Sequence, residues 1–303
     1  MMMETRRPLV AEIKRNSLDD GPGIRSVVFF KGCPLRCVWC HNPECIDPGP
    51  EILFRSDQCM GCGSCAGVCP EQAVSLQGPA ARDREKCVLC GACADECPSA
   101  SLSLIGKYYR AGALAASLAR DKAFYDNSGG GVTLSGGEPT LFMDYVSDLA
   151  RHLKEMGIEV LLETCGDFPW EPFRRKLLPH IDRIFVDIKL FEKDLHKKHT
   201  GRDNERIRKN IVRLIGLNRV DILVRVPLVP DITASRENLE ALAAWLWGEG
   251  LRRIALLPYN PVWIAKARGL GKPLRYDRDK WMSREDRDEV RGIFRDFEIE
   301  REI

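Results

Sequence analysis

The chain has 303 residues, of which 44% are hydrophobic and 30% charged, enough for one full-size core and a small additional unit. Its 46 Lys and Arg nearly balance 44 Asp and Glu, so the formal charge of +2 argues against a polyanion-binding surface, and we expect no nucleic-acid partner. No run of about 18 apolar residues and no N-terminal cleavage signal occur, so we expect a cytoplasmic protein with no membrane partner.

The first cysteines form a compact motif. The chain carries 13 cysteines, and an odd number in a reducing compartment indicates metal ligation or redox chemistry more than a disulfide framework. Cys33, Cys37 and Cys40 have the spacing C-x3-C-x2-C and follow an apolar strand pattern at residues 24–30. Three thiolates can ligate three irons of a [4Fe-4S] cluster and leave the fourth for a reactant, as catalytic zinc keeps one position open.

Two further cysteine runs form an internal repeat. Both have the spacing C-x2-C-x2-C-x3-C-P, and they begin at Cys59 and Cys87, 28 residues apart. This is the signature of bacterial two-cluster ferredoxins, in which the fourth cysteine of each run ligates the other cluster. Zinc knuckles are the alternative, but two zinc sites need neither the third C-x2 step nor the following Pro. We therefore expect one cluster on Cys59, Cys62, Cys65 and Cys97 and another on Cys69, Cys87, Cys90 and Cys93.

The repeat lies in a segment with recognisable edges. A turn-rich stretch, IDPGPE, precedes it at residues 46–51, and a helical pattern resumes near Gly112. We expect residues 51–105 to form a ferredoxin-like insert. Residues 1–50 and 106–303 are then one domain around it.

Outside the insert, strand patterns alternate with amphipathic helices. Short apolar runs occur as GVTL, IEVLLET, RIFVDIK, VDILVRVP and RRIALLPY. With the strand at 24–30, this predicts an α/β fold with six parallel strands, as a partial (β/α)6 barrel; a doubly wound open sheet is the alternative. Ser235 is the predicted N-cap of one helix. Helices are predicted at residues 141–156, 207–215, 235–248 and, as a solvated charged tail, 281–303.

Distinctive polar residues stand at the C-terminal ends of the expected strands, where β/α folds build their active sites. Each alone has a simpler explanation as a turn or a solvated pair. Five such strand ends at one rim favour a shared site. They are the SGGEP turn at residues 135–139, Glu163 in ETCG, Asp187 and Lys189, Arg225 just before Pro227, and LPYN at 257–260.

These motifs carry a family resemblance. C-x3-C-x2-C after a first strand and Gly-Gly-Glu-Pro after the second resemble the radical S-adenosylmethionine superfamily. More narrowly, DGPGIRSVVFFKGCPLRCVWCHNPE is similar to the signature of the glycyl-radical-enzyme activating enzymes, and HTGRDNERIRKNI, DIK and LLPYN to later segments of that family. The double-cluster insert is similar to that of members other than the shorter pyruvate formate-lyase activase. The resemblance covers residues 20–276.

The resemblance implies an oxidoreductase of anaerobic metabolism with a radical S-adenosylmethionine partial barrel, three [4Fe-4S] clusters and S-adenosylmethionine. Its reaction would be reductive cleavage of S-adenosylmethionine to a 5′-deoxyadenosyl radical, which takes a hydrogen from a Gly of a partner glycyl radical enzyme. Electrons would come from an external low-potential donor such as flavodoxin or ferredoxin. The cluster on Cys33, Cys37 and Cys40 would be catalytic. The implied S-adenosylmethionine contacts are Trp39, Cys40, His41, Gly136, Gly137, Glu138, Asp187, Ile188, Lys189, Arg225 and Asn260, and Glu163 would help to bind a monovalent cation.

Some positions stand apart from the family pattern. Position 260 is Asn where many relatives have His, and an amide forms hydrogen bonds but does not titrate. Cys45 and Cys165 lie outside the three ligand sets, and we expect both to fill space. Two rival functions stay open: a radical S-adenosylmethionine enzyme that acts on a small molecule or RNA, and a ferredoxin-type electron carrier. No residue selects which glycyl radical enzyme is activated.

Overall fold

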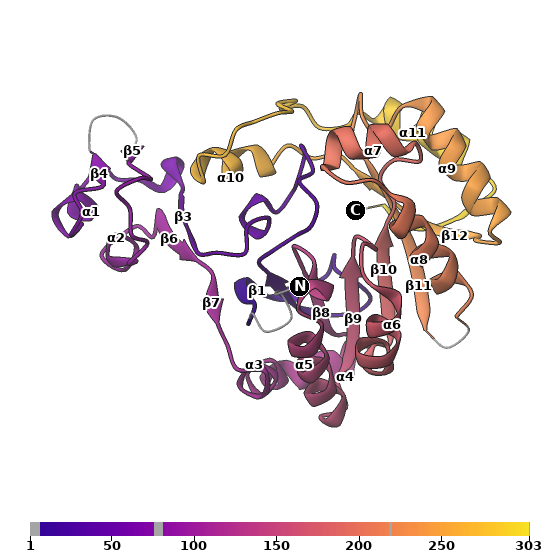
Figure 1. The fold of residues 1–303 in the computed structure, drawn as a ribbon, viewed down its shortest axis with the longest axis horizontal. Coiled ribbons are helices and arrows are strands. Elements are labelled where there is room, and N and C mark those ends of the chain that lie inside the picture. Colours follow the sequence, from indigo (N-terminus) through magenta and orange to yellow (C-terminus); the bar gives the residue numbers. More distant parts are fainter. Residues whose placement is uncertain (1–6, 76–80, 218–219, 303) are drawn as a thin grey trace.

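The computed structural model describes residues 7–75, 81–217 and 220–302. It consists of a large sheet with helices packed against it and a smaller lobe that contains both ferredoxin-like cysteine runs (Figure 1). Within the described residues the main sheet has nine strands. In spatial order they are β13 (Glu298–Glu302), β12 (Arg253–Pro258), β11 (Asp221–Leu228), β10 (Arg183–Asp187), β9 (Glu159–Thr164), β8 (Gly131–Gly136), β2 (Arg25–Phe30), β1 (Leu9–Ser17) and β7 (Lys107–Tyr108).

Seven consecutive strands of this sheet run parallel to one another, namely β2, β8, β9, β10, β11, β12 and β13. Their spatial order follows the chain order without a reversal. β1 and β7 add an antiparallel edge beyond β2. The predicted α/β fold with a parallel sheet is confirmed, and β2, β8, β9, β10, β11 and β12 are its six predicted strands.

The charged tail does not fold as predicted. Residues 284–293 are helical, but Glu298–Glu302 form β13, which pairs in parallel with β12. Ile299 packs against the main core, and Arg253 Nη1 lies 3.1 Å from Glu300 Oε2. The prediction of a solvated helix up to residue 303 is therefore wrong for this segment, because an edge strand with alternating charges resembles a polar helix in sequence.

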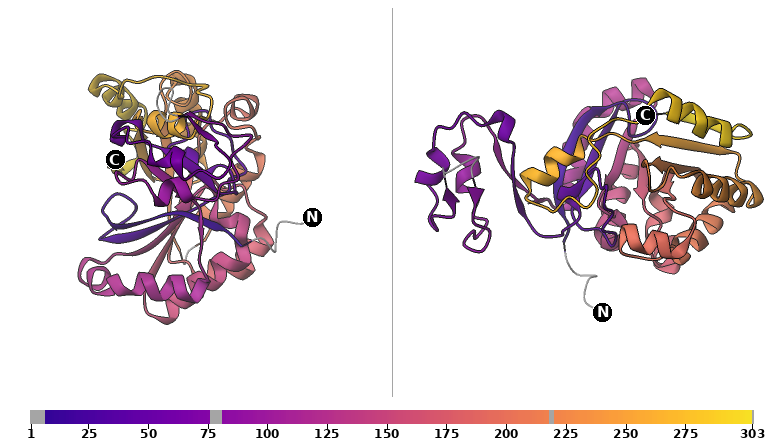
Figure 2. Two further views of the ribbon diagram at one scale, coloured as in Figure 1. Left: turned by 90° about the vertical axis from the view of Figure 1, so that its left-hand side faces the viewer. Right: turned by 90° about the horizontal axis from the view of Figure 1, so that it is seen from above.

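Helices cover the outer face of the parallel sheet (Figure 2). The three predicted internal helices are confirmed as α5, α8 and α9, and the Ser235 hydroxyl accepts the Asn238 N–H at the start of α9 as predicted. The helices are α3 (Ala111–Leu118), α4 (Lys122–Ser128), α5 (Met143–Glu155), α6 (Trp170–Pro172), α7 (Lys193–Thr200), α8 (Glu205–Ile215), α9 (Arg236–Gly248), α10 (Trp263–Gly269) and α11 (Arg284–Ile293).

The main core lies between these helices and one face of the strands. Val160, Leu162 and Val186 on the strands are fully buried there, together with Val146 and Leu149 of α5. Because successive side chains of a strand point to opposite faces, the residues between them point away from the helices. Those residues form the inner face of the sheet.

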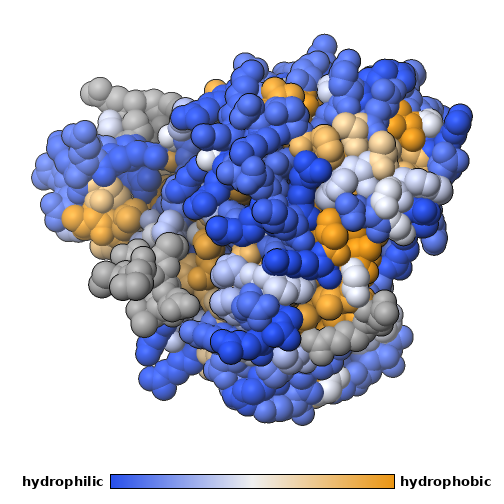
Figure 3. All heavy atoms as spheres, turned by 45° about the vertical axis from the view of Figure 1, so that its right-hand side comes forward, coloured by the Kyte–Doolittle hydropathy of each residue, from blue (hydrophilic) through white to orange (hydrophobic). Residues whose placement is uncertain are grey.

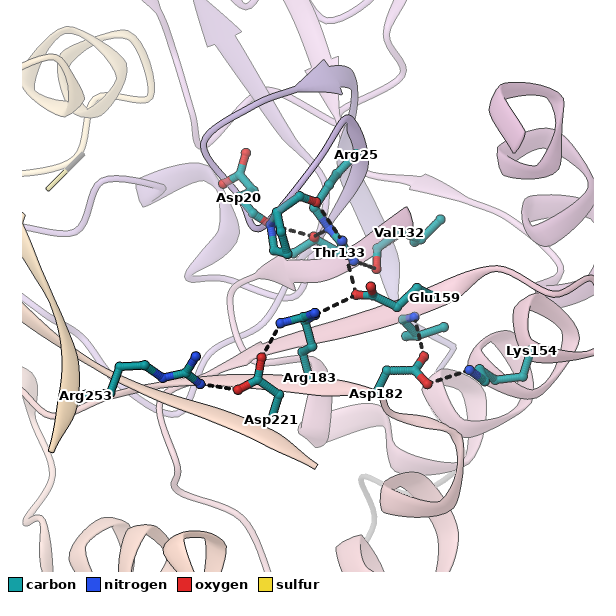
Figure 4. Close-up of polar contacts among 12 residues, drawn as sticks. Asp20, Arg25, Val132, Thr133, Lys154, Glu159, Asp182, Arg183, Asp221 and Arg253 are labelled. Atoms are coloured by element: carbon teal, nitrogen blue, oxygen red, sulfur yellow. Dashed lines mark hydrogen bonds and ion pairs between the residues drawn. The ribbon is translucent and has the colours of Figure 1, made fainter. Parts of the chain in front are cut away.

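The inner face has a charged layer at the N-terminal ends of the strands (Figure 4). Arg25 is fully buried, and its Nη1 lies 3.2 Å from Glu159 Oε1, which is also 3.3 Å from Arg183 Nε. Asp221 pairs with both Arg183 and Arg253. Every one of these five side chains has a partner of opposite charge.

An apolar layer follows one step along the same strands. Leu161, Phe185, Leu223 and Ala255 are buried together as a small cluster of their own, separate from the main core. The alternation of the strands produces this layer, because each residue lies two positions beyond a charged residue of the first layer. The third layer, at the C-terminal ends, is the candidate site.

The smaller lobe begins and ends at a pair of strands. β3 (Glu51–Phe54) pairs antiparallel with β6 (Leu102–Ile105), so that Glu51 lies opposite Ile105. Glu51 also accepts a hydrogen bond from the buried Lys31 and forms an ion pair with Lys272. These two contacts connect the lobe to the main part of the protein. Between these strands lie α1 (Ser64–Gly67), β4 (Val74–Ser75), β5 (Ala81–Arg82) and α2 (Ala92–Asp95).

The outer surface is mainly hydrophilic on the face shown in Figure 3, with separate apolar areas. In the part of the chain that the structure describes, no helix is long and apolar enough to cross a membrane.

Candidate active site

The third layer of the inner face borders a cavity of about 230 Å³. Residues from the C-terminal ends of β8 to β12 and from the loop after β2 line it together. The expectation of a shared rim is therefore matched by the geometry at most positions. The predicted residues that line the cavity are Cys33, Cys37, Trp39, Cys40, His41, Gly136, Gly137, Glu163, Asp187, Lys189 and Arg225.

The cysteine loop at residues 33–40 contains no helix or strand and is held by backbone contacts. The Arg36 N–H donates to the Thr200 carbonyl over 2.6 Å, and the Val38 N–H donates to the His199 carbonyl over 3.1 Å. Both acceptors lie at the C-terminal end of α7, in the HTGRDN segment. That segment therefore supports the loop that carries the three thiols.

Two thiols of this loop, Cys37 and Cys40, are not acidic in the absence of a metal. Burial raises the pKa of Cys37 far above its usual range, against the opposing effect of Lys189, and raises the pKa of Cys40 to about 12. A metal or cluster needs thiolates, so its binding here would displace protons.

The Gly-Gly pair after β8 permits a close backbone approach. A Cβ atom on Gly136, whose φ is 103°, would lie 2.3 Å from the Phe30 nitrogen, and one on Gly137 would lie 2.2 Å from the Gly32 carbonyl oxygen. The Gly137 N–H donates to the Phe30 carbonyl over 2.8 Å. Only glycine fits at these two positions, and their backbone lies directly against the start of the cysteine loop.

Glu138 lies behind the cavity wall. Its side chain is fully buried, and it does not line the cavity. Its oxygens accept hydrogen bonds from the Thr140 hydroxyl at 2.6 Å, the Thr164 hydroxyl at 2.8 Å and the Cys165 N–H at 2.7 Å. The carboxylate thus joins the turn after β8 to the end of β9.

A chain of polar contacts crosses the rim from β8 to β11. The Ser135 hydroxyl donates to Glu163 Oε2 over 2.6 Å, and Arg225 Nη1 donates to Glu163 Oε1 over 2.5 Å. Arg225 Nε also donates to Asp187 Oδ1 over 2.8 Å, and Lys189 Nζ donates to Asp187 Oδ2 over 3.0 Å. Two carboxylates and two cations therefore alternate along the rim.

These contacts fix the charge of each member. Burial alone would raise the pKa of Asp187, but Arg225 and Lys189 outweigh it and lower the pKa to about 2. Burial opposes charge on Lys189 and Arg225 too, yet the carboxylates raise the pKa of both cations above their usual values. Asp187, Lys189 and Arg225 are therefore ionised at neutral pH, and the rim can offer both signs of charge to a ligand.

Two aromatic side chains stand beside the third cysteine. Trp39 is buried in the cavity wall, and the His41 ring lies 6.2 Å from the ring of Tyr259.

Besides Glu138, two more predicted residues do not line the cavity. Ile188 is fully buried in the main core on the helix side of the sheet, and its N–H donates to the Arg225 carbonyl over 3.0 Å. Asn260 is half-buried but does not line the cavity, whereas the preceding Tyr259 does.

Sequence reasoning underrated the remaining two cysteines. Cys45 and Cys165 both line the cavity together with Cys33. The position of Cys165 in ETCG, at the end of a strand, was the available signal. Cys45 had none, because a 3₁₀ turn at Pro43–Cys45 brings it back to the loop.

Comparisons with known proteins identify the family. A family model described as a 4Fe-4S single cluster domain matches residues 19–208. The chain is 38% identical over 291 residues to the trans-4-hydroxy-L-proline dehydratase activating enzyme of Clostridioides difficile, covering 95% of this chain and 96% of that protein. It is 39% identical to the benzylsuccinate synthase activating enzyme of Thauera aromatica, covering 79% and 74%. The chain belongs to the glycyl-radical-enzyme activating enzymes, within the radical S-adenosylmethionine superfamily.

The fold of this activating enzyme agrees with that assignment. A radical S-adenosylmethionine methyltransferase from Sphaerobacter thermophilus superposes with a TM-score of 0.53 at 15% identity, covering 97% of this chain and 77% of that one. The prediction of an activating enzyme is confirmed by the relatives.

The lobe of this activating enzyme gathers its cysteines in two cavities. Each cavity takes three thiols from one run and one thiol from the other, which is the crossed pattern expected from the spacing. Among the described residues, no group of three or more His, Cys, Asp and Glu is placed to hold a metal ion. Cys59, Cys62, Cys65 and Cys97 line a cavity of about 260 Å³, and Cys69, Cys87, Cys90 and Cys93 line one of about 20 Å³.

Proposed function

We propose that this activating enzyme cleaves S-adenosylmethionine reductively and removes one hydrogen atom from the Cα of a Gly in a partner glycyl radical enzyme. The observation that carries the proposal is the meeting of Cys33, Cys37 and Cys40 with charged strand ends in one cavity, in a chain whose relatives are activating enzymes. When bound, a [4Fe-4S] cluster supplies one electron and S-adenosylmethionine supplies the 5′-deoxyadenosyl radical that takes the hydrogen.

The three thiols of the loop suit an iron–sulfur cluster. Thiolate is the ligand that such clusters select, and three of them leave one iron open. Burial raises the pKa of the Cys37 and Cys40 thiols, so these two resist ionisation until a cluster is present. We assign Cys45 and Cys165 to the cavity wall and not to the cluster.

The rim suits the amino-acid end of S-adenosylmethionine, which carries an ammonium and a carboxylate. Glu163 and Asp187 offer negative charge, and Lys189 and Arg225 offer positive charge, all in the same wall. Charge-assisted hydrogen bonds of this kind are short and directional, so they orient the group they hold. We propose that Glu163 also helps to bind a monovalent cation.

Other wall residues shape the space for the rest of the molecule. Gly136 and Gly137 present bare backbone, and the segment from Trp39 to His41 supplies a flat wall for the nucleoside. Trp39, together with the apolar layer beneath the rim, excludes water from the reacting atoms, as radical chemistry requires.

We propose that residues 51–105 form an inserted domain with two [4Fe-4S] clusters, which brings the total to three. The pairing of Glu51 with Ile105 at its entrance and exit supports these boundaries, and the crossed thiol sets support the cluster assignment. Their role is to accept electrons from an external low-potential donor, flavodoxin or ferredoxin, and pass them toward the cavity.

We propose that the main sheet is a partial (β/α)6 barrel. The strand order has no reversal, whereas a doubly wound sheet has one at its ligand site. The separate apolar cluster on the inner face corresponds to the filled interior of a β/α barrel. An open side would admit a polypeptide loop that carries the target Gly.

The decisive experiment is anaerobic incubation of the iron-reconstituted protein with S-adenosylmethionine and dithionite. We expect 5′-deoxyadenosine and methionine as products, measured by chromatography. Addition of trans-4-hydroxy-L-proline dehydratase or benzylsuccinate synthase, the enzymes named in two relatives, tests the partner by the glycyl radical doublet in electron paramagnetic resonance. Failure to form 5′-deoxyadenosine with a fully loaded protein would refute the reaction.

A further inference from the structure

A second cleft, larger than the candidate active site, lies between the lobe and the main sheet. Its volume is about 610 Å³. One wall comes from β3, β6 and residues 55–57 of the lobe, and the other from β1 and α10 of the main part. Figures 1 and 2 both show α10 as the helix that faces the lobe.

Four arginines line this cleft without a carboxylate partner. Arg55, Arg82 and Arg84 come from the lobe, and Arg268 comes from α10 on the other wall. Within the described residues, none of the four takes part in an ion pair, although ion pairs are common elsewhere on this surface. With Lys266 the cleft holds five cations against three acids, Glu12, Glu44 and Asp57, so its net charge is positive.

Three of these arginines are placed in the cleft by neighbours other than carboxylates. Arg55 Nη1 donates to the Ser103 hydroxyl over 3.0 Å, and Arg82 Nη1 lies 3.9 Å from Cys87 Sγ. Arg84 reaches across to the opposite wall, where a Cβ atom on Gly271 would lie 2.4 Å from its Nη2 atom. None of these neighbours is a carboxylate, so the guanidiniums of Arg55 and Arg84 stay available to an incoming partner.

The cleft adjoins both four-cysteine cavities of the lobe. Ile52 and Arg82 line it and also line the cavity of Cys69, Cys87, Cys90 and Cys93. On the other side, Phe54, Ser56 and Leu102 line it and also line the cavity of Cys59, Cys62, Cys65 and Cys97. A partner seated in the cleft therefore contacts residues that enclose each thiol set.

We propose that this arginine-lined cleft is the docking site of an acidic ferredoxin that delivers electrons to the lobe. The inference rests on the proposed function, which requires an external one-electron donor. Complementary charge steers and orients such encounters more than it adds affinity, and unpaired guanidiniums on both walls fit an acidic surface. One electron leaves the reduced cluster of the ferredoxin and enters a cluster of the lobe, and no bond is made or broken.

The test is a double charge reversal, Arg84→Glu with Arg268→Glu, which alters both walls. The matched control is Arg120→Glu with Arg175→Glu, two exposed arginines of the main part that lie outside the cleft. Binding of an acidic two-cluster ferredoxin to the loaded protein is measured by calorimetry, without S-adenosylmethionine. We expect Kd to rise about tenfold or more for the cleft variant and less than about twofold for the control.

Two further measurements distinguish a loss of ferredoxin docking from a general loss of folding or of cluster reduction. The ratio of ferredoxin-driven to dithionite-driven cluster reduction, followed by stopped-flow absorbance, falls in the cleft variant only. The Kd of the unmodified protein rises with salt concentration, and that dependence is weaker after the double reversal. If the reversal impairs folding, as judged by circular dichroism, Arg84→Gln with Arg268→Gln gives the same comparison with a smaller perturbation.

Equal Kd values for the cleft and control variants would overturn the proposal. So would a cleft variant that loses binding to flavodoxin but keeps its affinity for ferredoxin. Ferredoxin binding is measured without turnover, so the binding result does not depend on S-adenosylmethionine cleavage. If the protein with dithionite fails to cleave S-adenosylmethionine, that failure refutes the proposed function alone.

Discussion

The two ends of the inner face are both lined by arginines and carboxylates, but they differ in what surrounds them. At the N-terminal ends, Arg25, Glu159, Arg183, Asp221 and Arg253 pair with one another, and further Arg25 donors bind the Thr133 hydroxyl and two backbone carbonyls (Figure 4). At the C-terminal ends, the same alternation of charge borders a cavity and three thiols. Paired arginines and carboxylates in this fold therefore form a candidate binding site only where a cavity lies beside them.

The largest effect is expected at the cavity end. Replacement of Cys33, Cys37 and Cys40 by Ala should lower S-adenosylmethionine cleavage at least about a thousandfold, because the electron for cleavage enters through these ligands. Iron should fall by about four atoms from about twelve per chain, measured by colorimetry. Cys45→Ala, in the same wall, is the control and should keep both values. Full iron content in the triple variant would contradict the assignment.

The second prediction concerns the opposite end. Arg25→Met should lower the free energy of unfolding by about 3 kcal/mol, because it leaves Glu159 buried with one partner fewer. Denaturant titration measures the change. The affinity of the folded variant for S-adenosylmethionine should stay within about twofold of the original. A larger change in affinity would mean that the two ends are coupled through the apolar layer.

The contribution of Asp187, at the cavity end, to the free energy of unfolding should be lost in a defined range of acidic pH. The folded pKa of Asp187, about 2, lies below the usual value of about 3.9 in an unfolded chain. Its stabilising contribution is therefore complete above about pH 4 and is lost as the pH falls toward 2; it amounts to roughly 2–3 kcal/mol. Unfolding free energies measured between pH 2 and pH 6 should show this slope in the original protein and a shallower one in Asp187→Asn. Identical slopes would show that Asp187 is not held ionised by Arg225 and Lys189.

The smallest effect is expected at the exposed margin of the N-terminal network. Lys154 Nζ lies 2.6 Å from Asp182 Oδ1, but both side chains are about one-third exposed. Lys154→Ala should therefore cost only about 0.5 kcal/mol in thermal unfolding. A loss as large as that of Arg25→Met would remove the distinction between buried and exposed pairs.

Much of the parallel sheet and its rim could be predicted from sequence. Apolar runs separated by amphipathic helices specify strand order, and strand ends in one direction specify a common rim. Asp187 and Lys189 lie there because they flank Ile188 in a two-residue alternation. The same alternation turns Ile188 to the helix side, so its exclusion from the cavity was available in the sequence.

Other features depend on contacts between distant segments. Glu138 lies behind the cavity wall because its carboxylate accepts hydrogen bonds from Thr140, Thr164 and the Cys165 N–H. These donors come from separate segments, so no local sequence pattern predicts them. The N-terminal network depends on register, which places Arg183 beside Asp221. β13 was missed because polar residues dominate this edge strand, and among residues 298–300, whose side chains the structure describes, Ile299 alone packs against the core.

The apolar layer of Leu161, Phe185, Leu223 and Ala255 has a further meaning for how such a protein changes over evolutionary time. It separates one set of stabilising charged contacts, at the N-terminal ends of the strands, from the site of substrate recognition at the other end. Substitutions at the rim that adapt the cavity to another partner then leave the charged contacts at the N-terminal ends intact, and those contacts continue to stabilise the fold. One scaffold can in this way accompany several unrelated partner enzymes.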